Sequence, residues 1–531
     1  MRNGLLTVCC GVLLAFGLQA ATVQEQLTKT ATAQALSEQA LAPVIERALQ
    51  SFNTPGMAVG ISFQGERLHL AGYGQRDLAQ QLPVNAQTYF RLASASKAFT
   101  AASVAILVDE GKLNWDDKVI SHLPAFRLKD PWVTAEFTIR DLLSHRSGLV
   151  SAAGDSMIWP EPSGFSRAEV IHNLRFLTPE FGFRSRYSYS NVLYITAAEL
   201  VATVSGQPWE QFVAERIFSP LQMQCFAGAM PSTSLSNIAL GYRFDADSGF
   251  IEIPRNHING QGLMSAAAGG VVCSAADTLN WLEYLLQLQQ GKAVPQVFSA
   301  RQLAQMWSPQ TIMTASARDQ QLNQTHFSHY GLGWRMHDMH GFKVITHTGT
   351  LSGYQAYVAL VPAQQLAVVL LNNGSDSGAR NAVMQTILKA LVPELEQVDW
   401  IADEQEQQEL RRQRAAARVE LPVGTGQVQL PLADYSGDFA DQWFGAMQLT
   451  EQAGQLRIES ARMLNLRGSL TPFVDHSFVI KWDDANAARD SFIHFQVNGL
   501  RQVTGFTLSP FAVEAPLAHE WRDMLFLKKQ M

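Results

Sequence analysis

The sequence has few cysteines and few charges, and its one long apolar run stands at the very start. Only 4 of the 531 residues are Cys, and 16% are charged against 47% that are hydrophobic. The formal net charge is -7, and Lys and Arg form no long cluster, so there is no electrostatic footprint for nucleic acid. We therefore expect a folded globular protein of two or three domains without a nucleic-acid partner.

The apolar run covers residues 5–18, which is shorter than the ~20 residues that a spanning helix needs. Arg2 precedes it, and the small residues Ala20 and Ala21 follow it. Positive charge, apolar core and small residues in this order are typical of a secretory signal peptide. We predict that residues 1–21 are cleaved, that no integral membrane segment remains, and that the mature protein is periplasmic or secreted.

Signal cleavage leaves the mature chain with only Cys225 and Cys273. An oxidising compartment permits two cysteines to pair, but their spacing along the chain does not establish that they do. We treat both as structural, because a buried cysteine behaves as a small apolar residue.

The arrangement of periodic segments predicts an α/β (α+β) fold. Residues 57–77, 342–361 and 366–373 alternate or run apolar like strands, and they lie at the two ends of a region that is mostly helical. Strands at both ends predict one antiparallel sheet assembled from distant segments, flanked by helices and with an inserted helical domain. We assign residues 22–400 to this domain.

The last part of the chain has a different composition. Residues 401–428 begin with good helix formers that have hardly any apolar face, and Pro and Gly follow them, so we predict a linker helix. Residues 429–531 contain short alternating runs separated by Gly, Asn and Asp, which predict a small antiparallel β-barrel or sandwich.

Ser94 and Lys97 stand three residues apart at the start of a predicted amphipathic helix. Side chains at i and i+3 share a helix face, so the hydroxyl and the amine can meet. A serine needs a base to become a nucleophile, and a lysine is a base only when burial or positive charge lowers its pKa. The spacing alone favours a solvated helix start, because two common residue types meet it by accident in a chain of this length.

Two further polar groups could take part in chemistry together with Ser94 and Lys97. Tyr189 and Asn191 lie in a polar turn before a helix, where a phenol can move a proton and an amide can orient an amine. His347 to Thr350 end an alternating strand, and Gly349 there lets a substrate lie against the backbone. Each group by itself also fits a purely structural role.

Taken in order, the three groups resemble the motifs of the penicillin-recognising serine hydrolases, which include class C β-lactamases, D-alanyl-D-alanine carboxypeptidases, D-aminopeptidases and related esterases. The flanking stretches "TIRDLLSHRSGL", "AAAGGVVCSAADTLNWL" and "YGLGWRM" resemble the same family, so the resemblance covers roughly residues 35 to 395. The C-terminal part resembles the lipocalin-like β domain of some peptidase-like members. The motifs are Ser94-x-x-Lys97, Tyr189-x-Asn191 and His347-Thr348-Gly349.

The resemblance implies a role for each residue. Ser94 is the acylated nucleophile, Lys97 helps to deprotonate it, and Tyr189 carries protons. Asn191 holds Lys97 and the substrate amide. The backbone N–H groups of Ser94 and Thr350 form an oxyanion hole, which is a large contribution to acyl transfer. His347, Thr348 and Gly349 contact the substrate, and the resemblance implies no cofactor and no metal.

The residue at position 347 distinguishes between subfamilies of these serine hydrolases. Class C β-lactamases usually have Lys there, whereas His-Thr-Gly resembles certain D-alanyl-D-alanine peptidases. A histidine is only partly charged at neutral pH, so we expect a weak, pH-dependent attraction for a substrate carboxylate. We predict an exported serine hydrolase acting on a peptide or small-molecule substrate, most simply a D-amino-acid-containing or otherwise unusual peptide. A carboxylesterase, a weak class C-like β-lactamase and a β-lactam or peptide binding protein without turnover remain alternatives.

Other candidates for chemistry have simpler interpretations. His337 and His340 flank a predicted hairpin turn without further ligands nearby, so we expect no metal site there. We interpret His145 as structural, because it lies in a flanking stretch that carries no chemistry in the family. The GxSxG elbow of the α/β-hydrolases is absent from the sequence.

Overall fold

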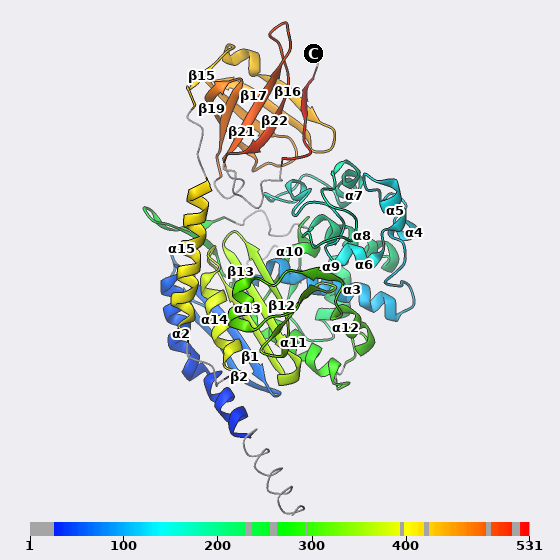
Figure 1. Ribbon diagram of the computed structural model, residues 1–531, viewed down its shortest axis with the longest axis vertical. Coiled ribbons are helices and arrows are strands. Elements are labelled where there is room, and N and C mark those ends of the chain that lie inside the picture. Colours follow the sequence, from blue (N-terminus) through cyan, green and yellow to red (C-terminus); the bar gives the residue numbers. More distant parts are fainter. Residues whose placement is uncertain are drawn as a thin grey trace, which may run out of the picture.

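The computed structural model describes residues 26–228, 236–254, 263–292, 295–392, 398–418, 424–484, 490–511 and 521–529. The predicted signal peptide, residues 1–21, lies outside these ranges. A large body of sheet and helices carries a separate β-barrel at one end, and the helix α15 (Trp400–Arg418) runs along the body toward the barrel (Figure 1).

The main sheet has nine antiparallel strands in the order β3-β2-β1-β14-β13-β12-β11-β10-β9. The N-terminal strand β1 pairs with β2 on one side and with β14 on the other, which confirms a sheet built from distant segments. The strands are β1 (Gly56–Phe63), β2 (Glu66–Asp77), β3 (Leu82–Pro83), β9 (Thr311–Met313), β10 (Ser328–Tyr330), β11 (Arg335–Met339), β12 (Phe342–Leu351), β13 (Tyr354–Val361) and β14 (Leu366–Asn372).

Helices cover both faces of this sheet, and this explains why β1 and β14 are buried at every position. Alternate side chains of a strand point to opposite faces, so Val59 joins the core under one helical layer while Ala58 joins the core under the other. One layer contains α2 (Glu38–Ser51), α14 (Gly378–Lys389) and the start of α15. The other contains α3 (Lys97–Asp109), α8 (Val192–Ser205) and α11 (Ala275–Gln289).

The middle of the chain forms the predicted helical region beside the sheet (Figure 1). Two of its short helices begin with capping boxes, in which Thr138 pairs with Asp141 and Ser166 with Glu169. The helices are α4 (Val119–His122), α5 (Pro131–Glu136), α6 (Ile139–Leu143), α7 (Arg167–Asn173), α9 (Trp209–Val213), α10 (Ala266–Gly269), α12 (Ala300–Met306) and α13 (Ala317–Asn323). Small sheets join β4 (Phe90–Arg91), β8 (Val271–Cys273) and β5 (Phe226–Ala227), and β6 (Gly241–Asp245) with β7 (Gly249–Ile253).

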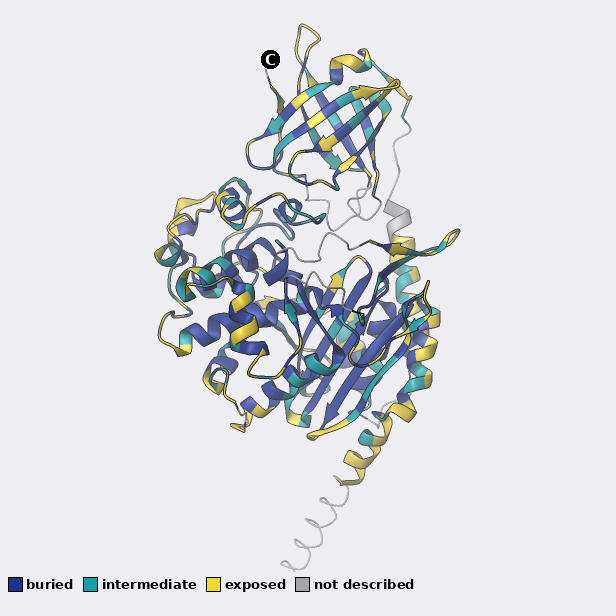
Figure 2. Cartoon of the chain, turned by 180° about the vertical axis from the view of Figure 1, so that it is seen from behind, coloured by how far each residue is buried: buried dark blue, intermediate teal, exposed yellow. Residues whose placement is uncertain are grey.

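The C-terminal strands close into a barrel, because the first strand of the ring, β19, also pairs with the last, β20. Its interior is filled by aromatic rings from Phe439, Phe478, Phe495 and Phe506, and buried positions alternate with exposed ones along its strands (Figure 2). The ring contains β16 (Gly437–Asp441), β17 (Gly445–Gln452), β18 (Gln455–Ser460), β19 (Arg467–Asp475), β20 (Ser477–Trp482), β21 (Ser491–Val497), β22 (Val503–Pro510) and β23 (Phe526–Lys528), with β15 (Gln427–Val428) parallel to β19.

The helix that follows Ser94 corrects one expectation. We predicted an amphipathic helix, but every residue of α3 from Lys97 to Leu107 is buried, since the helix passes between other helices and the sheet. A helix that is surrounded by protein is apolar all round. Within the described ranges, each helix is either too short or too polar to cross a bilayer.

Candidate active site

Ser94 lies in a 3₁₀ turn, Ala93–Ser96, that joins β4 to α3. Side chains at i and i+3 of a 3₁₀ turn eclipse each other, and the Ser94 Oγ is 3.4 Å from the Lys97 Nζ. Ala93 has the left-handed φ of 47°, which costs energy for a residue with a Cβ. The surrounding fold therefore holds the serine in a conformation that the local sequence does not favour.

Lys97 is fully buried, and its amine has two oxygen partners besides Ser94. Its Nζ donates to Asn191 Oδ1 and to the Ala268 carbonyl, both at 2.7 Å. Burial lowers the pKa of Lys97 well below its ordinary value; the Arg335 charge lowers it further, and Asp155 acts in the opposite direction. Burial thus favours the neutral form of the amine that faces the serine hydroxyl.

Tyr189 precedes α8, and its ring lies 4.6 Å from the Lys97 Nζ. Burial raises the pKa of Tyr189, while its contact with Ser94 acts in the opposite direction. The Tyr189 hydroxyl does not reach regular hydrogen-bond geometry in this contact. The ring also packs against that of His145, with the ring centroids 4.2 Å apart and the planes tilted by 38°. The Ser190 backbone N–H donates to His145 Nδ1 at 3.1 Å. Through these two contacts, His145 supports the turn that carries Tyr189.

Asp155 is a site residue that sequence reasoning missed. Its Oδ2 accepts from Asn191 Nδ2 at 2.7 Å, so the amide of Asn191 is oriented with its oxygen toward Lys97. Asp155 starts a single 3₁₀ turn, Asp155–Met157, and no periodicity or motif in the sequence singles it out. Only its place beside Asn191 reveals it.

The strand β12 brings His347, Thr348, Gly349 and Thr350 to the nucleophile. A Cβ on Gly349 would lie 2.1 Å from the Leu92 carbonyl oxygen, so only glycine permits this close approach of β12 to the turn that carries Ser94. Thr350 follows as an exposed residue of the strand, paired with Gln355 of β13.

His347 differs from our expectation. Its imidazole is fully buried, with Nε2 3.0 Å from the Tyr330 hydroxyl and Nδ1 2.8 Å from the Thr348 carbonyl. Burial lowers the pKa of His347 well below its ordinary value, and the charges of Arg335 and Lys97 lower it further. Burial and the hydrogen-bond partners of both ring nitrogens thus work against the partial positive charge that we expected near neutral pH.

Arg335 on β11 is a second residue that sequence reasoning missed, although it stands inside the quoted stretch "YGLGWRM". Its guanidinium donates to the Tyr187 hydroxyl at 3.1 Å and lies 5.8 Å from the Tyr189 ring. Among the described residues, no carboxylate lies within ion-pair distance of it. The charge of this arginine also lowers the pKa of Lys97.

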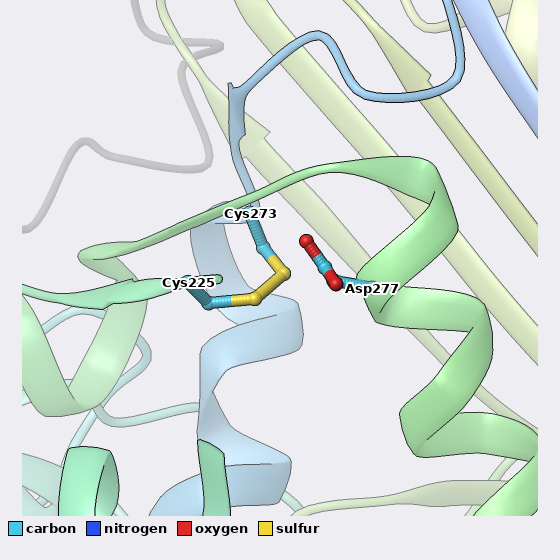
Figure 3. Close-up of side chains that lie close together, drawn as sticks. All are labelled: Cys225, Cys273 and Asp277. Atoms are coloured by element: carbon cyan, nitrogen blue, oxygen red, sulfur yellow. A yellow bond between two sulfur atoms is a disulfide. The ribbon is translucent and has the colours of Figure 1, made fainter. Parts of the chain in front are cut away.

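The structure joins Cys225 and Cys273 in a disulfide, beside Asp277 (Figure 3). Although the three side chains lie together, the two sulfur atoms are bonded to each other and are not free thiolate ligands. His337 lies on β11 and His340 in the turn before β12, which confirms the predicted hairpin; the His340 ring contacts Lys389 Nζ at 2.7 Å.

Comparison with family profiles matches residues 41–391 to the β-lactamase family and residues 422–523 to a domain of unknown function, DUF3471. The first match contains the whole Ser94, Lys97, Asn191 and β12 constellation. The second covers most of the barrel.

The chain is similar to the unguisins hydrolase of Aspergillus violaceofuscus, with 27% identity over 462 residues that span 79% of this chain and 77% of that protein. Among solved structures, it is similar to the octameric penicillin-binding protein homologue from Pyrococcus abyssi, with a TM-score of 0.58, 18% identity, and coverage of 92% of this chain and 99% of that one. The D-amino acid amidase from Ochrobactrum anthropi gives a TM-score of 0.54 and 21% identity, over 66% of this chain and 98% of that one.

Proposed function

This chain belongs to the β-lactamase family of serine hydrolases, and from that premise we propose that it is acylated on Ser94 and cleaves amide bonds next to a D-amino acid that bears a free carboxylate. The proposal assigns the chemistry to Ser94, Lys97 and Tyr189, and the recognition of the carboxylate to Arg335.

The state of Lys97 carries this proposal. A neutral amine has two N–H donors and one lone pair. The two N–H groups have acceptors in Asn191 Oδ1 and the Ala268 carbonyl, each at 2.7 Å. Ser94 Oγ lies 3.4 Å from the same nitrogen. When the amine is neutral, its remaining position is a lone pair that faces this hydroxyl, which is the arrangement that a general base requires.

In the acylation step, Ser94 Oγ bonds to the substrate carbonyl carbon while its proton passes to Lys97 Nζ. The carbonyl oxygen becomes an oxyanion, which accepts from the backbone N–H groups of Ser94 and Thr350. The C–N bond then breaks, and the leaving amine receives a proton by way of Tyr189. In deacylation, water attacks the ester, gives its proton to the same groups, and releases the acid and the free Ser94 hydroxyl.

Arg335 supports a substrate with an anionic group. A guanidinium stays charged in proteins and binds carboxylates in a fork geometry. Among the described residues, this one has a phenol partner, Tyr187, and no carboxylate within ion-pair distance, and its Nε is buried without a hydrogen-bond partner. A carboxylate of the bound substrate would complete its hydrogen bonds. The name of the structurally similar D-amino acid amidase supports an amide of a D-amino acid.

The proposal includes export. The predicted signal peptide supports it, and so does the Cys225–Cys273 disulfide, since disulfides persist in oxidising compartments. The intact mass of the protein isolated from its natural source checks this point: retention of residues 1–21 would contradict it.

The test begins with the native chain and Ser94→Ala, each incubated with a penicillin and with a fluorophosphonate probe while the intact mass is followed. We expect an adduct on the native chain that Ser94→Ala lacks. A persistent adduct with the penicillin and no turnover of any peptide would favour a binding protein over a hydrolase.

The second stage compares peptides that end in a D-residue with a free carboxylate against the same peptides with an amidated end. We expect the carboxylate peptides to be better substrates, and Arg335→Gln to lower kcat/KM for them by about 10- to 100-fold while changing the amidated peptides little. Higher activity on simple esters or on β-lactams than on both peptides would contradict the proposed substrate class.

A further inference from the structure

Glu161 forms a buried ion pair with Arg91, the residue of β4 that lies just before the turn of Ser94. The pair is bidentate, with distances of 2.9 Å and 3.0 Å, and the side chains of Arg91 and Glu161 are only 1% and 2% exposed. The Ser265 hydroxyl donates to the same carboxylate at 2.5 Å. Neither charge can be removed alone without leaving its partner buried and uncompensated.

This carboxylate connects the two elements on either side of the Ser94–Lys97 pair. Through Arg91 it holds β4, which leads into the turn of Ser94. Through Ser265 it holds the start of α10, whose Ala268 carbonyl accepts from Lys97. The distance between the hydroxyl and the amine therefore depends on where Glu161 sits.

The loop that carries Glu161 is in turn held by the barrel, through the segment Arg462–Asn465 between β18 and β19. Asn465 Nδ2 donates to the Glu161 carbonyl at 2.6 Å, and the Gly164 N–H donates to the Arg462 carbonyl at 2.8 Å. Ser163 and Met463 form an antiparallel bridge, and Met463 is fully buried. A Cβ on Gly164 would lie 2.4 Å from the Arg462 carbonyl oxygen, so the two backbones are in close contact.

We propose that Glu161 and the barrel segment Arg462–Asn465 form a positioning device for the nucleophile. The barrel fixes the position of the loop, and the loop fixes the position of the Glu161 carboxylate. The carboxylate in turn holds Arg91 and Ser265, so that Ser94 and Lys97 keep their separation. Glu161 and Asn465 are positioning residues, since they act through Arg91 and Ser265. This inference rests on the proposed function of Ser94.

The first test measures how fast a fluorophosphonate modifies Ser94 in the full-length chain, as a function of probe concentration. The step forms an O–P bond on Ser94, releases fluoride and transfers the serine proton to Lys97. We expect Asn465→Ala to lower the rate at saturating probe by about 3- to 10-fold while leaving the half-saturating concentration unchanged, because small displacements of reacting groups mainly affect the chemical step. Gln448→Ala removes a barrel amide that donates a hydrogen bond to Asp438 on a neighbouring barrel strand, and should react like the native chain.

The second test uses Glu161→Gln and Glu161→Asp, with folding checked by thermal unfolding. We expect a loss of about 100-fold in the saturated rate for Glu161→Gln, and a partial recovery for Glu161→Asp, which keeps the charge but shortens the reach. If Glu161→Gln does not fold, Asn465→Ala still decides the matter.

The outcomes separate the two proposals. If the native chain is labelled on Ser94 and Asn465→Ala reacts at the native rate, the positioning role is overturned and the proposed function stands. If Asn465→Ala loses thermal stability but keeps its saturated rate, the contact only holds the fold together, and the positioning role is again overturned. If the native chain is not labelled on Ser94, the proposed function fails and this inference fails with it.

Discussion

At the scale of single residues, the proposed chemistry depends on Lys97, whose side chain is completely buried. The Lys97 Nζ donates to two oxygen acceptors at 2.7 Å, Asn191 Oδ1 and the Ala268 carbonyl. Its position three residues after Ser94 is visible in the sequence, but its complete burial is not. Burial of this side chain lowers its pKa, as a general base requires, and it follows only from tertiary packing.

The pH dependence of Ser94 labelling checks this account. Lys97 must be neutral, so we expect the rate to fall as pH decreases through the lowered pKa of Lys97 and to be constant above it. Arg335 lowers that pKa and Asp155 raises it. Arg335→Gln should therefore move the acid limb to higher pH, and Asp155→Asn should move it to lower pH.

The probe for this measurement is an uncharged fluorophosphonate, so that a direct contact between Arg335 and a carboxylate plays no part. The electrostatic account would be contradicted if the acid limb moved in the same direction in Arg335→Gln and Asp155→Asn, or if it moved in neither variant. Ser94→Ala, which should remain unlabelled at every pH, is the control for labelling elsewhere.

At the scale of elements, β12 and the turn of Ser94 must touch through their backbones. The sequence predicts a strand that ends in His-Thr-Gly-Thr, and the structure has β12 there. It could not predict that Gly349 would face the Leu92 carbonyl, because this contact joins two segments that are far apart in the chain. The buried state of α3 was missed for the same reason, since it depends on the elements packed around the helix.

Gly349→Ala tests this contact. The added methyl group would force β12 away from the Leu92 carbonyl, so we expect a loss of about 100-fold in the rate of Ser94 labelling and a lower free energy of unfolding by about 1–3 kcal/mol. Gly341→Ala, in the turn before β12, has a φ of 84° and open space around its Cβ position. We expect it to cost about 1 kcal/mol of stability without changing the labelling rate. Equal rates for both variants would show that the close approach is not needed.

At the scale of the whole molecule, burial also makes stability depend on pH. His69, His145 and His347 are buried, and burial lowers the pKa of each one, for His69 to about 4. The unfolded chain therefore binds protons between pH 6.5 and pH 4 that the folded chain does not, and the free energy of unfolding falls as pH decreases through this window.

For His69 alone, this proton linkage lowers the free energy of unfolding by about 2 kcal/mol as the pH falls from 7 to 5. We expect His69→Gln, which can keep a hydrogen bond to the Tyr73 hydroxyl, to reduce the fall in stability over that interval by this amount. Urea unfolding of both chains at the two pH values measures it. An identical fall in both chains would mean that His69 is protonated in the folded protein.

The barrel and its docking also belong to this scale. Alternating runs in residues 429–511 predict strands, and the family resemblance implies a lipocalin-like domain; both agree with the closed ring of β16 to β23. Where that ring would dock was not predictable. The bond between Asn465 and the Glu161 carbonyl joins residues 304 apart, and neither stands in a motif.

By itself, the sequence determined what short stretches of chain encode. The spacing of Ser94 and Lys97, the alternation of β12 and the order of the three motifs are local properties, and they were sufficient for the fold class and for the serine hydrolase family. The tertiary structure alone decided the burial that lowers the pKa of Lys97 and of His347, the place of Arg335 and Asp155, and the link from the barrel to Glu161. These depend on desolvation and on contacts between distant segments, which exist only once the layers have packed.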